Sequence, residues 1–466
     1  MVQIFKQLFC IYFILGFSII TISQTTQVGS ASYTNSHPGT DAAGRNNFPS
    51  GSPQLSGNAI GKPVPTNDWW SKLIKEDHAD NLFNYPMTMK TTNTGLIVTY
   101  VPWGVIGDNQ AIEVGLTGLS TTKATVANYS DWTVTMNWKD ADNELNVTSG
   151  IGMPFLYYEK DANDIVEIKV NSGNATINNE VLIIENASGQ DFAFYAPVGS
   201  TWSSTGNTYT STLNGKTYWS MAMLPQNTSN VASVVQDLKK YAYVFPTNTT
   251  SSWVYNESNS KLTTTFNVTT DVKEGTDSKM LLGLLPHQWY NLTSSSPVPN
   301  VYTYNSVRGE LKMLAENSFT VENTFKGILP TTPYLANYSA GFSPAELESK
   351  IAQIENEGLA TWTDSYNEGQ VMNRLIQTAR IADQTGNIAA RDKMIATVKE
   401  RLEDWLTYSS GEKAFLFYYN NTWSAMLGYP AGHGQDSNIN DHHFHWGYFI
   451  HAAAFMEQFD AAQVFQ

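Results

Sequence analysis

The stretch FSPAELESKIAQIENEG, residues 342–358, marks the point at which the pattern of the sequence changes. Ser343 can cap the amino end of a helix, Pro344 suits the first helical position, and Glu346 stands three residues after the cap, as in a capping box. Gly358 stands where such a helix would end. The stretch therefore predicts a helix, and it divides the chain into two parts of different character.

Before this stretch, from about residue 61 to 325, the sequence favours β-strands. Segments rich in β-branched and aromatic residues, such as DWTVTMNW (131–138) and EVLIIEN (180–186), alternate with turn signals such as Asn214-Gly215. Regular strands without intervening helices predict a large antiparallel β-sandwich over 61–325. The preceding residues 24–60 are rich in Ser, Thr, Gly, Asn and Pro without periodicity, which predicts a flexible leader.

After this stretch the sequence favours helices. Two are predicted, over 366–384 and 387–408, because apolar residues recur there at helical spacing. An extended aromatic run, KAFLFYYNNTW (413–423), and a Gly-rich loop, GYPAGHGQDSNIND (428–441), lead into a further helix from about Phe444. The sequence thus predicts a multidomain β + α protein, with the β-domain first and paired helices after it.

The amino-terminal end has the features of a secretory signal. Lys6 precedes the apolar run LFCIYFILGFSIITI (8–22) and small residues follow, so residues 1–23 are predicted to be a signal peptide and the protein to be secreted. The run is shorter than the roughly 20 residues that a spanning helix needs. The only cysteine, Cys10, lies in this segment, so the predicted mature chain has neither a disulfide nor a cysteine metal site.

The net charge and the aromatic content limit the kinds of partner that the protein is expected to bind. The 466-residue chain has a formal net charge of −15, which disfavours nucleic acid and anionic membranes. We expect no nucleic-acid partner, no membrane partner after signal cleavage, and a monomer. Aromatic residues make up 12% of the chain. Their rings suit stacking on sugars, but a β-rich core also favours them.

One aspartate and three histidines occupy residues 441–445 (DHHFH), in a chain with eight histidines. Their spacing is poor for a metal site, because neither an extended segment nor a helix places all of them on one face. A buried histidine at the start of the helix is a second interpretation. The third is general acid catalysis by Asp441, because a carboxyl that donates a proton near neutral pH needs a raised pKa, which burial beside aromatic residues supplies.

The segment NDHHFHWGYFIHAAA (440–454) resembles closely the signature of glycoside hydrolase family 81, the endo-β-1,3-glucanases or laminarinases. PVPTNDWW (63–70), LLPHQW (284–289) and KGILPTTP (326–333) resemble earlier segments of that family in the same order. The resemblance covers most of the chain from about residue 62.

The resemblance implies a fold and a domain order. A large antiparallel β-sandwich would be followed by a small connecting α/β region at 326–360 and by an (α/α)6 barrel, of which residues 361–466 would form the first, incomplete part.

The resemblance also implies an activity and its residues. The protein would be an endo-1,3-β-D-glucanase that hydrolyses β-1,3-glucan with inversion and needs no metal or other cofactor, and Asp441 would be its general acid. We predict that His443, His445, Trp446 and Tyr448 contact the glucan. Trp446 stands where the family usually has a tyrosine, and it keeps an aromatic ring at that position.

Inverting hydrolysis needs a second carboxyl, about 6.5–9.5 Å from the first. The family's general base is a glutamate in a later barrel helix. The residues from 343 onward suffice for about six helices, so we expect an incomplete protein whose base lies beyond residue 466 and which has little activity alone. Asp436 is a weak candidate for the base, and Glu457 lies roughly 20 Å along the predicted helix. The alternative function is a non-catalytic β-1,3-glucan-binding protein.

Overall fold

The computed structural model describes residues 25–40, 49, 51–80, 82–100, 110–226, 228–299, 301–335, 340–356 and 363–459. By its internal contacts the chain forms two compact units, Gly51–Leu329 and Met1–Ser50 together with Pro330–Gln466. We call them the sandwich unit and the helical unit. The predicted signal peptide lies outside the described residues. Within them, no helix combines the length and apolar character needed to cross a membrane.

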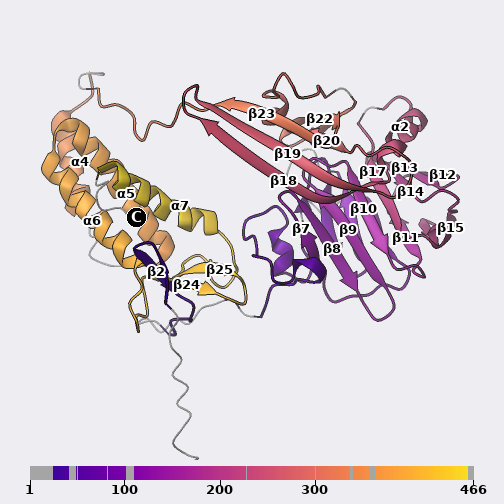
Figure 1. The fold of residues 1–466 in the computed structure, drawn as a ribbon, viewed down its shortest axis with the longest axis horizontal. Helices are drawn as coiled ribbons and strands as arrows, with labels where there is room; N and C mark the ends of the chain where they lie inside the picture. Colours follow the sequence, from indigo (N-terminus) through magenta and orange to yellow (C-terminus); the bar gives the residue numbers. More distant parts are fainter. Residues whose placement is uncertain are drawn as a thin grey trace, which may run out of the picture. The chain divides into compact units, whose positions relative to one another are not determined.

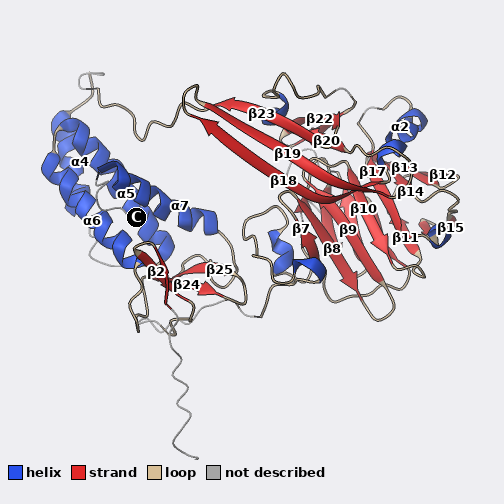
Figure 2. Cartoon of the chain, in the orientation of Figure 1, coloured by secondary structure: helices blue, strands red, loops and turns tan. Residues whose placement is uncertain are grey.

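Two large antiparallel sheets dominate the sandwich unit (Figures 1 and 2). The strands of the first are β7 Thr125–Tyr129, β8 Thr133–Lys139, β9 Glu144–Gly150, β10 Phe155–Lys160, β12 Asn174–Asn178, β13 Val181–Ala187, β14 Gln190–Tyr195 and β17 Tyr218–Met223. Those of the second are β3 Leu82–Phe83, β4 Thr88–Thr92, β5 Gly95–Thr99, β6 Ile112–Leu116, β11 Val166–Val170, β15 Ser203–Thr205 and β16 Thr208–Ser211. The strand orders are β12-β13-β14-β17-β10-β9-β8-β7 and β15-β16-β11-β6-β5-β4-β3.

The core of the sandwich lies between these sheets. Along β8, Val134, Met136 and Trp138 are fully buried, as expected for one face of a strand whose side chains alternate between the two sides. The Trp138 indole nitrogen Nε1 donates a hydrogen bond of 2.8 Å to the carbonyl oxygen of Thr92, which joins the first sheet to the second. The predicted fold class, a large antiparallel sandwich followed by helices, is confirmed.

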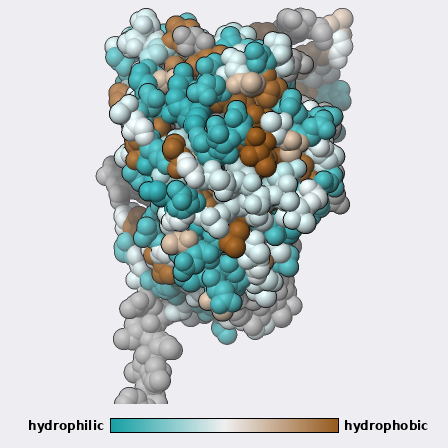
Figure 3. Space-filling view, turned by 90° about the vertical axis from the view of Figure 1, so that its right-hand side faces the viewer, coloured by the Kyte–Doolittle hydropathy of each residue, from teal (hydrophilic) through white to brown (hydrophobic). Residues whose placement is uncertain are grey.

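Smaller elements complete the sandwich unit. They are the sheet of β18 Val244–Asn256, β19 Lys261–Val272 and β23 Ser318–Thr324, the sheet of β20 Leu281–Leu284, β21 Thr303–Ser306 and β22 Gly309–Ala315, the helices α2 Val231–Leu238 and α3 Pro286–Trp289, and the 3-10 turns η1 Gly57–Ala59, η2 Ser71–Ile74, η3 Leu213–Gly215 and η4 Lys239–Tyr241. The sequence did not predict α2, which is short and begins where the Asn230 side chain accepts from Ser233 N. On the side drawn in Figure 3, hydrophilic residues predominate and hydrophobic ones form small separate patches.

Within the described part of the helical unit, four helices form the core: α4 Pro344–Asn356, α5 Ser365–Thr385, α6 Ile388–Leu406 and α7 His442–Phe459. The cap predicted for α4 is present, since Ser343 Oγ accepts from Glu346 N at 3.2 Å. The helices predicted at 366–384 and 387–408 correspond to α5 and α6, which are separated by Gly386 at a φ of 80°. Gly358 lies outside the described residues, and so does part of the predicted connecting region at 326–360.

Helix α7 begins earlier than Phe444, the predicted start. The carbonyl oxygen of Asp441 accepts from Phe444 N at 3.1 Å and from His445 N at 3.2 Å, so the first helical turn already closes on Asp441. Asp441 is therefore the residue that precedes the helix, and His442 is its first member.

The prediction of a flexible leader over residues 24–60 is wrong for its first part. Strands β1 Thr25–Val28 and β2 Ala31–Thr34 form a hairpin, and the sheet order is β1-β2-β24-β25, with β24 Leu416–Asn420 and β25 Ala425–Tyr429. Strand β2 pairs in parallel with β24 through Thr34 and Tyr418. Polar strand residues are stable here because a distant strand supplies their hydrogen-bond partners, which local sequence does not reveal.

Candidate active site

The candidate site consists of the loop before α7 and the amino ends of α5 and α7, all within the helical unit. Asp364 caps α5, because its Oδ1 accepts from Tyr366 N and Asn367 N, both at 3.0 Å. The loop contacts this cap directly: the Pro430 carbonyl oxygen accepts from Ser365 N at 2.9 Å. A side chain at Gly432 would collide with the Asp364 carboxyl. The glycine thus lets the loop lie against the start of α5.

Three residues of this loop other than glycine have a left-handed backbone: His433 (φ 48°), Ile439 (φ 53°) and Asp441 (φ 55°). Aspartate tolerates this conformation, but a β-branched residue such as isoleucine seldom adopts it. Ile439 is only 4% exposed, so packing of its side chain holds the strained backbone in place. Such strain costs on the order of 1–3 kcal/mol per residue and concentrates at functional sites. The loop thus presents Asp441 in a fixed position.

Two histidines of the cluster are buried next to Asp441. The Nδ1 atom of His445 lies 2.7 Å from Ser365 Oγ, and the Nε2 atom of His442 lies 3.3 Å from the Gln435 carbonyl oxygen. A carbonyl oxygen only accepts, so His442 carries its proton on Nε2. Burial lowers the pKa of His442, and burial together with the neighbouring His442 lowers the pKa of His445 to about 4. Both rings are therefore neutral at pH 7.

This burial predicts a pH dependence of stability that the variant His445→Asn removes. A histidine with a pKa near 4 in the folded state and about 6.5 in the unfolded state contributes stability that is fully present above pH 6.5 and is lost as the pH falls to about 4. The contribution is about 3 kcal/mol at most. As the pH falls from 6.5 to 4, we expect the unfolding free energy of the wild type to decrease more steeply than that of His445→Asn. Urea denaturation at several pH values measures both. Parallel curves would contradict the buried neutral state.

The Asp441 side chain is half-buried at the surface of the cluster. Among the described residues it accepts one side-chain hydrogen bond, from Asn440 Nδ2 to its Oδ2 at 3.1 Å. The other carboxyl oxygen can therefore face a ligand. The two neutral histidines place no positive charge beside this carboxyl.

The four residues predicted to contact substrate are placed differently from one another. His443 is exposed, and Tyr448 is half-buried where α7 passes close to Gly369 of α5. Trp446 lies with its ring 4.8 Å from that of Phe417, centroid to centroid. His445 has no exposed surface, so its burial argues against direct contact with a glucan and for a role in holding α7 against α5.

Two hollows adjoin these aromatic residues. One, of about 340 Å³, is lined by Asn367, Gln370, Val371, Asn373, Arg374 and Tyr448. The other, of about 260 Å³, is apolar and lies against Trp446, Tyr33 and Phe417. Tyr448 thus borders a polar space between two helices, whereas Trp446 borders an apolar one beneath the amino-terminal hairpin.

The structure adds site residues that the sequence analysis missed. Ser365 and Gln435 hold the two buried histidines, and Asp364 holds the loop. A helix-capping signal at Asp364 was available in the sequence, because aspartate is a preferred N-cap residue. No signal pointed to Ser365 as the partner of His445, which lies 80 residues later. No group of three or more His, Cys, Asp or Glu side chains suited to a metal occurs within the described ranges.

The carboxyl-terminal segment that holds this site matches a known family model. Residues 341–466 match the glycosyl hydrolase family 81 C-terminal domain. This part of the chain belongs to glycoside hydrolase family 81. The resemblance predicted from residues 440–454 is thereby confirmed.

Similarity to known proteins extends over the rest of the chain. A glucan endo-1,3-beta-D-glucosidase of Thermobifida fusca is 33% identical over 97% of this chain and 60% of its own length. A glucan endo-1,3-beta-D-glucosidase of Acetivibrio thermocellus is 34% identical over 84% of this chain and 51% of its own length. The structure of the family 81 glycoside hydrolase CtLam81A from Clostridium thermocellum, solved as a glutamate-to-alanine variant, matches with a TM-score of 0.81 and 32% identity over 94% of this chain and 61% of that one. The chain thus spans between half and about three fifths of the length of these proteins.

Proposed function

We propose that the protein is an endo-1,3-β-D-glucanase that hydrolyses β-1,3-glucan with inversion, and that Asp441 is its general acid. The observation that carries the proposal is the position of Asp441, which is held by a strained loop at the start of α7 with its carboxyl half exposed beside two neutral histidines. The relatives named as glucan endo-1,3-beta-D-glucosidases support the substrate class.

In this proposal Asp441 donates its proton to the glycosidic oxygen while a base on the opposite face of the sugar activates a water molecule. The two carboxyls of an inverting enzyme stand about 6.5–9.5 Å apart. Glu457 stands 15 residues after His442 on α7, about 22 Å along the helix axis, so it is not that base. Asp436 is 5% exposed and accepts from Ser437 N at 2.7 Å, which gives it a role in the loop.

We propose that the base is a glutamate of a later barrel helix, in the additional length that the family relatives have. Secretion through the segment 1–23 and a monomeric state belong to the same proposal. His443 and Tyr448 have exposed surface with which to contact the glucan beside Asp441.

The test uses an active form of the enzyme, which is either this chain or this chain joined to the remaining barrel segment of the Acetivibrio thermocellus relative. Proton NMR during hydrolysis of laminarin is expected to show the α-anomer first, because inversion of a β-linkage produces it. Activity is expected to survive treatment with a chelator. Initial formation of the β-anomer would refute inversion, and a chelator-induced loss restored by zinc would refute metal independence. Glucan binding without hydrolysis in either form would favour the non-catalytic alternative.

A further inference from the structure

A polar groove lies on the outward face of the eight-stranded sheet in the sandwich unit. Its volume is about 650 Å³, within the range typical of ligand sites. Its floor is formed by outward side chains of β7, β8, β9 and β10, and its walls come from η1 and from the start of β18 at Pro246 and Thr247. Gly57 permits the first wall, since a Cβ at this position would lie 3.1 Å from the Ala127 carbonyl oxygen of β7.

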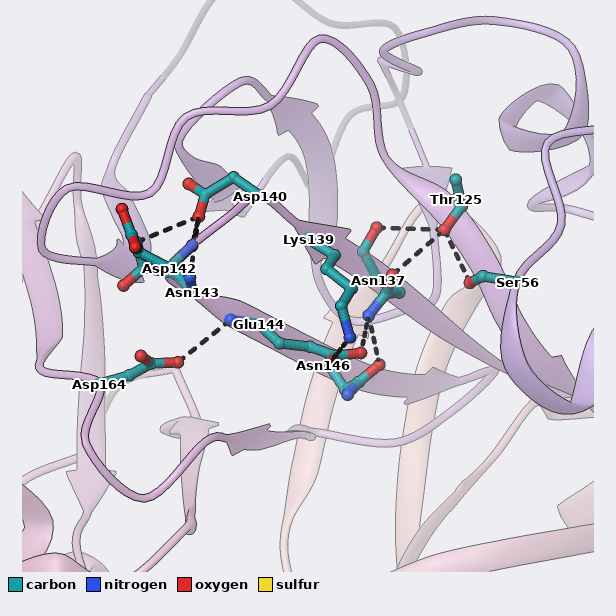
Figure 4. Close-up of polar contacts among 10 residues, drawn as sticks. All are labelled: Ser56, Thr125, Asn137, Lys139, Asp140, Asp142, Asn143, Glu144, Asn146 and Asp164. Carbon is teal, nitrogen blue, oxygen red and sulfur yellow. Dashed lines mark hydrogen bonds and ion pairs between the residues drawn. The ribbon is translucent and has the colours of Figure 1, made fainter.

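The floor is organised in rows that run across the strands. In one row Asn137 of β8 stands between Thr125 of β7 and Asn146 of β9, and in the next Thr135 stands opposite Thr148. Asn137 Nδ2 donates to Asn146 Oδ1 at 3.0 Å and to Glu144 Oε1 at 3.0 Å (Figure 4). These contacts fix the side chains before any ligand arrives, which lowers the entropic cost of binding.

The same row continues to the wall of the groove. Thr125 Oγ1 lies 3.3 Å from Asn137 Oδ1 and 2.8 Å from Ser56 Oγ, next to η1 (Figure 4). The wall and the floor therefore form one hydrogen-bonded unit.

Each charged side chain that lines the groove has a partner: Lys139 and Glu144 pair within it, and Glu159 pairs with Lys273 beside it. Lys139 Nζ lies 2.5 Å from Glu144 Oε2, and Glu159 Oε1 lies 3.0 Å from Lys273 Nζ. Apart from Ala127, the remaining floor residues carry amide or hydroxyl side chains. Because each of these charges already has a partner, the surface offers an ion no unpaired counter-charge, and it matches a neutral ligand rich in hydroxyl groups.

The floor also keeps hydrogen-bonding capacity for a ligand. Asn146 uses Oδ1 as an acceptor, while its Nδ2 has no partner among the described residues. The hydroxyls of Thr135 and Thr148 lie 2.8 Å apart, and each retains a lone pair for a further donor. An amide donor at Asn146 and the hydroxyl acceptors at Thr135 and Thr148 suit the hydroxyl groups of a sugar.

We propose that this groove is a second carbohydrate site, which binds a neutral glucan strand on the sandwich unit. The site is built without any residue of the helical unit. The choice of a β-1,3-linked strand rests on the proposed function, whereas the choice of a neutral sugar rests on the groove itself.

The test uses the whole chain with Asp441→Asn, to prevent hydrolysis, and Cys10→Ser, so that an introduced cysteine is the only one. Asn58→Cys on the exposed wall carries an environment-sensitive fluorophore, and Asn174→Cys on the exposed strand β12, at the opposite edge of the sheet, is the matched control. Laminarihexaose in the millimolar range is expected to change the fluorescence saturably at residue 58 and not at residue 174.

A blocking variant and a charged probe complete the test. Asn146→Trp fills the groove and is expected to weaken the signal at residue 58 at least about ten-fold, while Asn174→Ala leaves it unchanged. An acidic hexamer of galacturonate is expected to bind at least about ten-fold more weakly than laminarihexaose. Any of three results would overturn the proposal. The first is the absence of a saturable signal at residue 58, and the second is a signal that survives Asn146→Trp in a chain whose melting temperature is unchanged. The third is equal binding of the acidic hexamer and laminarihexaose. None of these results depends on hydrolysis, so failure of the groove and failure of the proposed activity are distinguishable.

Discussion

Replacing Asp441 with asparagine is expected to lower the turnover of laminarin by about 10²-fold or more in an active form of the enzyme. The amide keeps the size of the side chain and can accept from Asn440 at the same place, but it has no acidic proton for the leaving oxygen. Because the lost interaction belongs to the transition state, the affinity for laminarin is expected to change little. Initial rates of reducing-sugar release and a separate binding measurement on the same variant check both statements.

Two other carboxyls serve as controls for this variant. Glu457→Gln changes an exposed carboxyl of the same helix by the same chemistry, and its turnover is expected to stay near that of the wild type. Asp436→Asn is expected to affect the loop more than the chemistry, because Asp436 is buried and holds Ser437 N. Near-normal turnover in Asp441→Asn would remove the acid assignment, and a larger loss at Asp436 would transfer it there.

Replacing Arg401 with methionine is expected to destabilise the helical unit by about 3–5 kcal/mol. Arg401 Nη1 lies 2.7 and 2.8 Å from the two carboxyl oxygens of Glu368, and the two side chains are 2% and 1% exposed. The pair joins α5 to α6 in the core that supports the site. Without Arg401, the Glu368 carboxylate stays buried with its main counter-charge removed. Chemical denaturation, followed by the circular dichroism of the helices, measures the loss of unfolding free energy.

The pH dependence of this variant has a defined sign. Burial already raises the pKa of Glu368 although Arg401 opposes the shift, and removal of Arg401 raises it further. The folded state then binds the proton more tightly than the unfolded state, so stability is lost as the pH rises above the unfolded pKa of about 4.3. The loss is expected to be larger at pH 8 than at pH 5.

Matched variants separate the buried charge from the loss of an arginine. Arg391 pairs with Asp383 near the surface at 2.7 Å, and Arg391→Met is expected to cost about 1 kcal/mol or less. The double variant Glu368→Leu with Arg401→Met is expected to recover much of the stability, because no uncompensated charge remains. An Arg401→Met variant as stable as Arg391→Met would contradict the structural role of the pair.

Local patterns predicted the elements whose stability is local. The cap at Ser343 and the helices α5 and α6 follow from residues within a few positions of one another, and the strands of the sandwich follow from alternation and turn residues. The hairpin at residues 25–34 could not be predicted in this way. Its partner β24 begins at residue 416, and its buried residues Ser32 and Thr34 are polar.

In the candidate site too, local sequence predicted some features, and others depend on tertiary contacts. The cluster at 441–445 identified the region, because its composition is unusual wherever it lies in a fold. The separate roles of its histidines depend on tertiary contacts: Ser365 reaches His445 from another helix, while His443 turns to solvent. The start of α7 was misplaced because the first turn closes on a carbonyl oxygen, a group that every residue has.

The most direct test of the central claim is a crystal structure of the active form with Asp441→Asn and bound laminarihexaose. We expect the side-chain amide of residue 441 to lie about 3 Å from a glycosidic oxygen. We also expect a carboxyl on the opposite face of the adjoining sugar, about 6.5–9.5 Å from the residue 441 side chain, with room for a water molecule between this carboxyl and the sugar. Two results would contradict the assignment of Asp441 as the acid of an inverting enzyme. One is a glucan bound with residue 441 away from every glycosidic oxygen. The other is a second carboxyl only about 5–5.5 Å away, as in retaining enzymes.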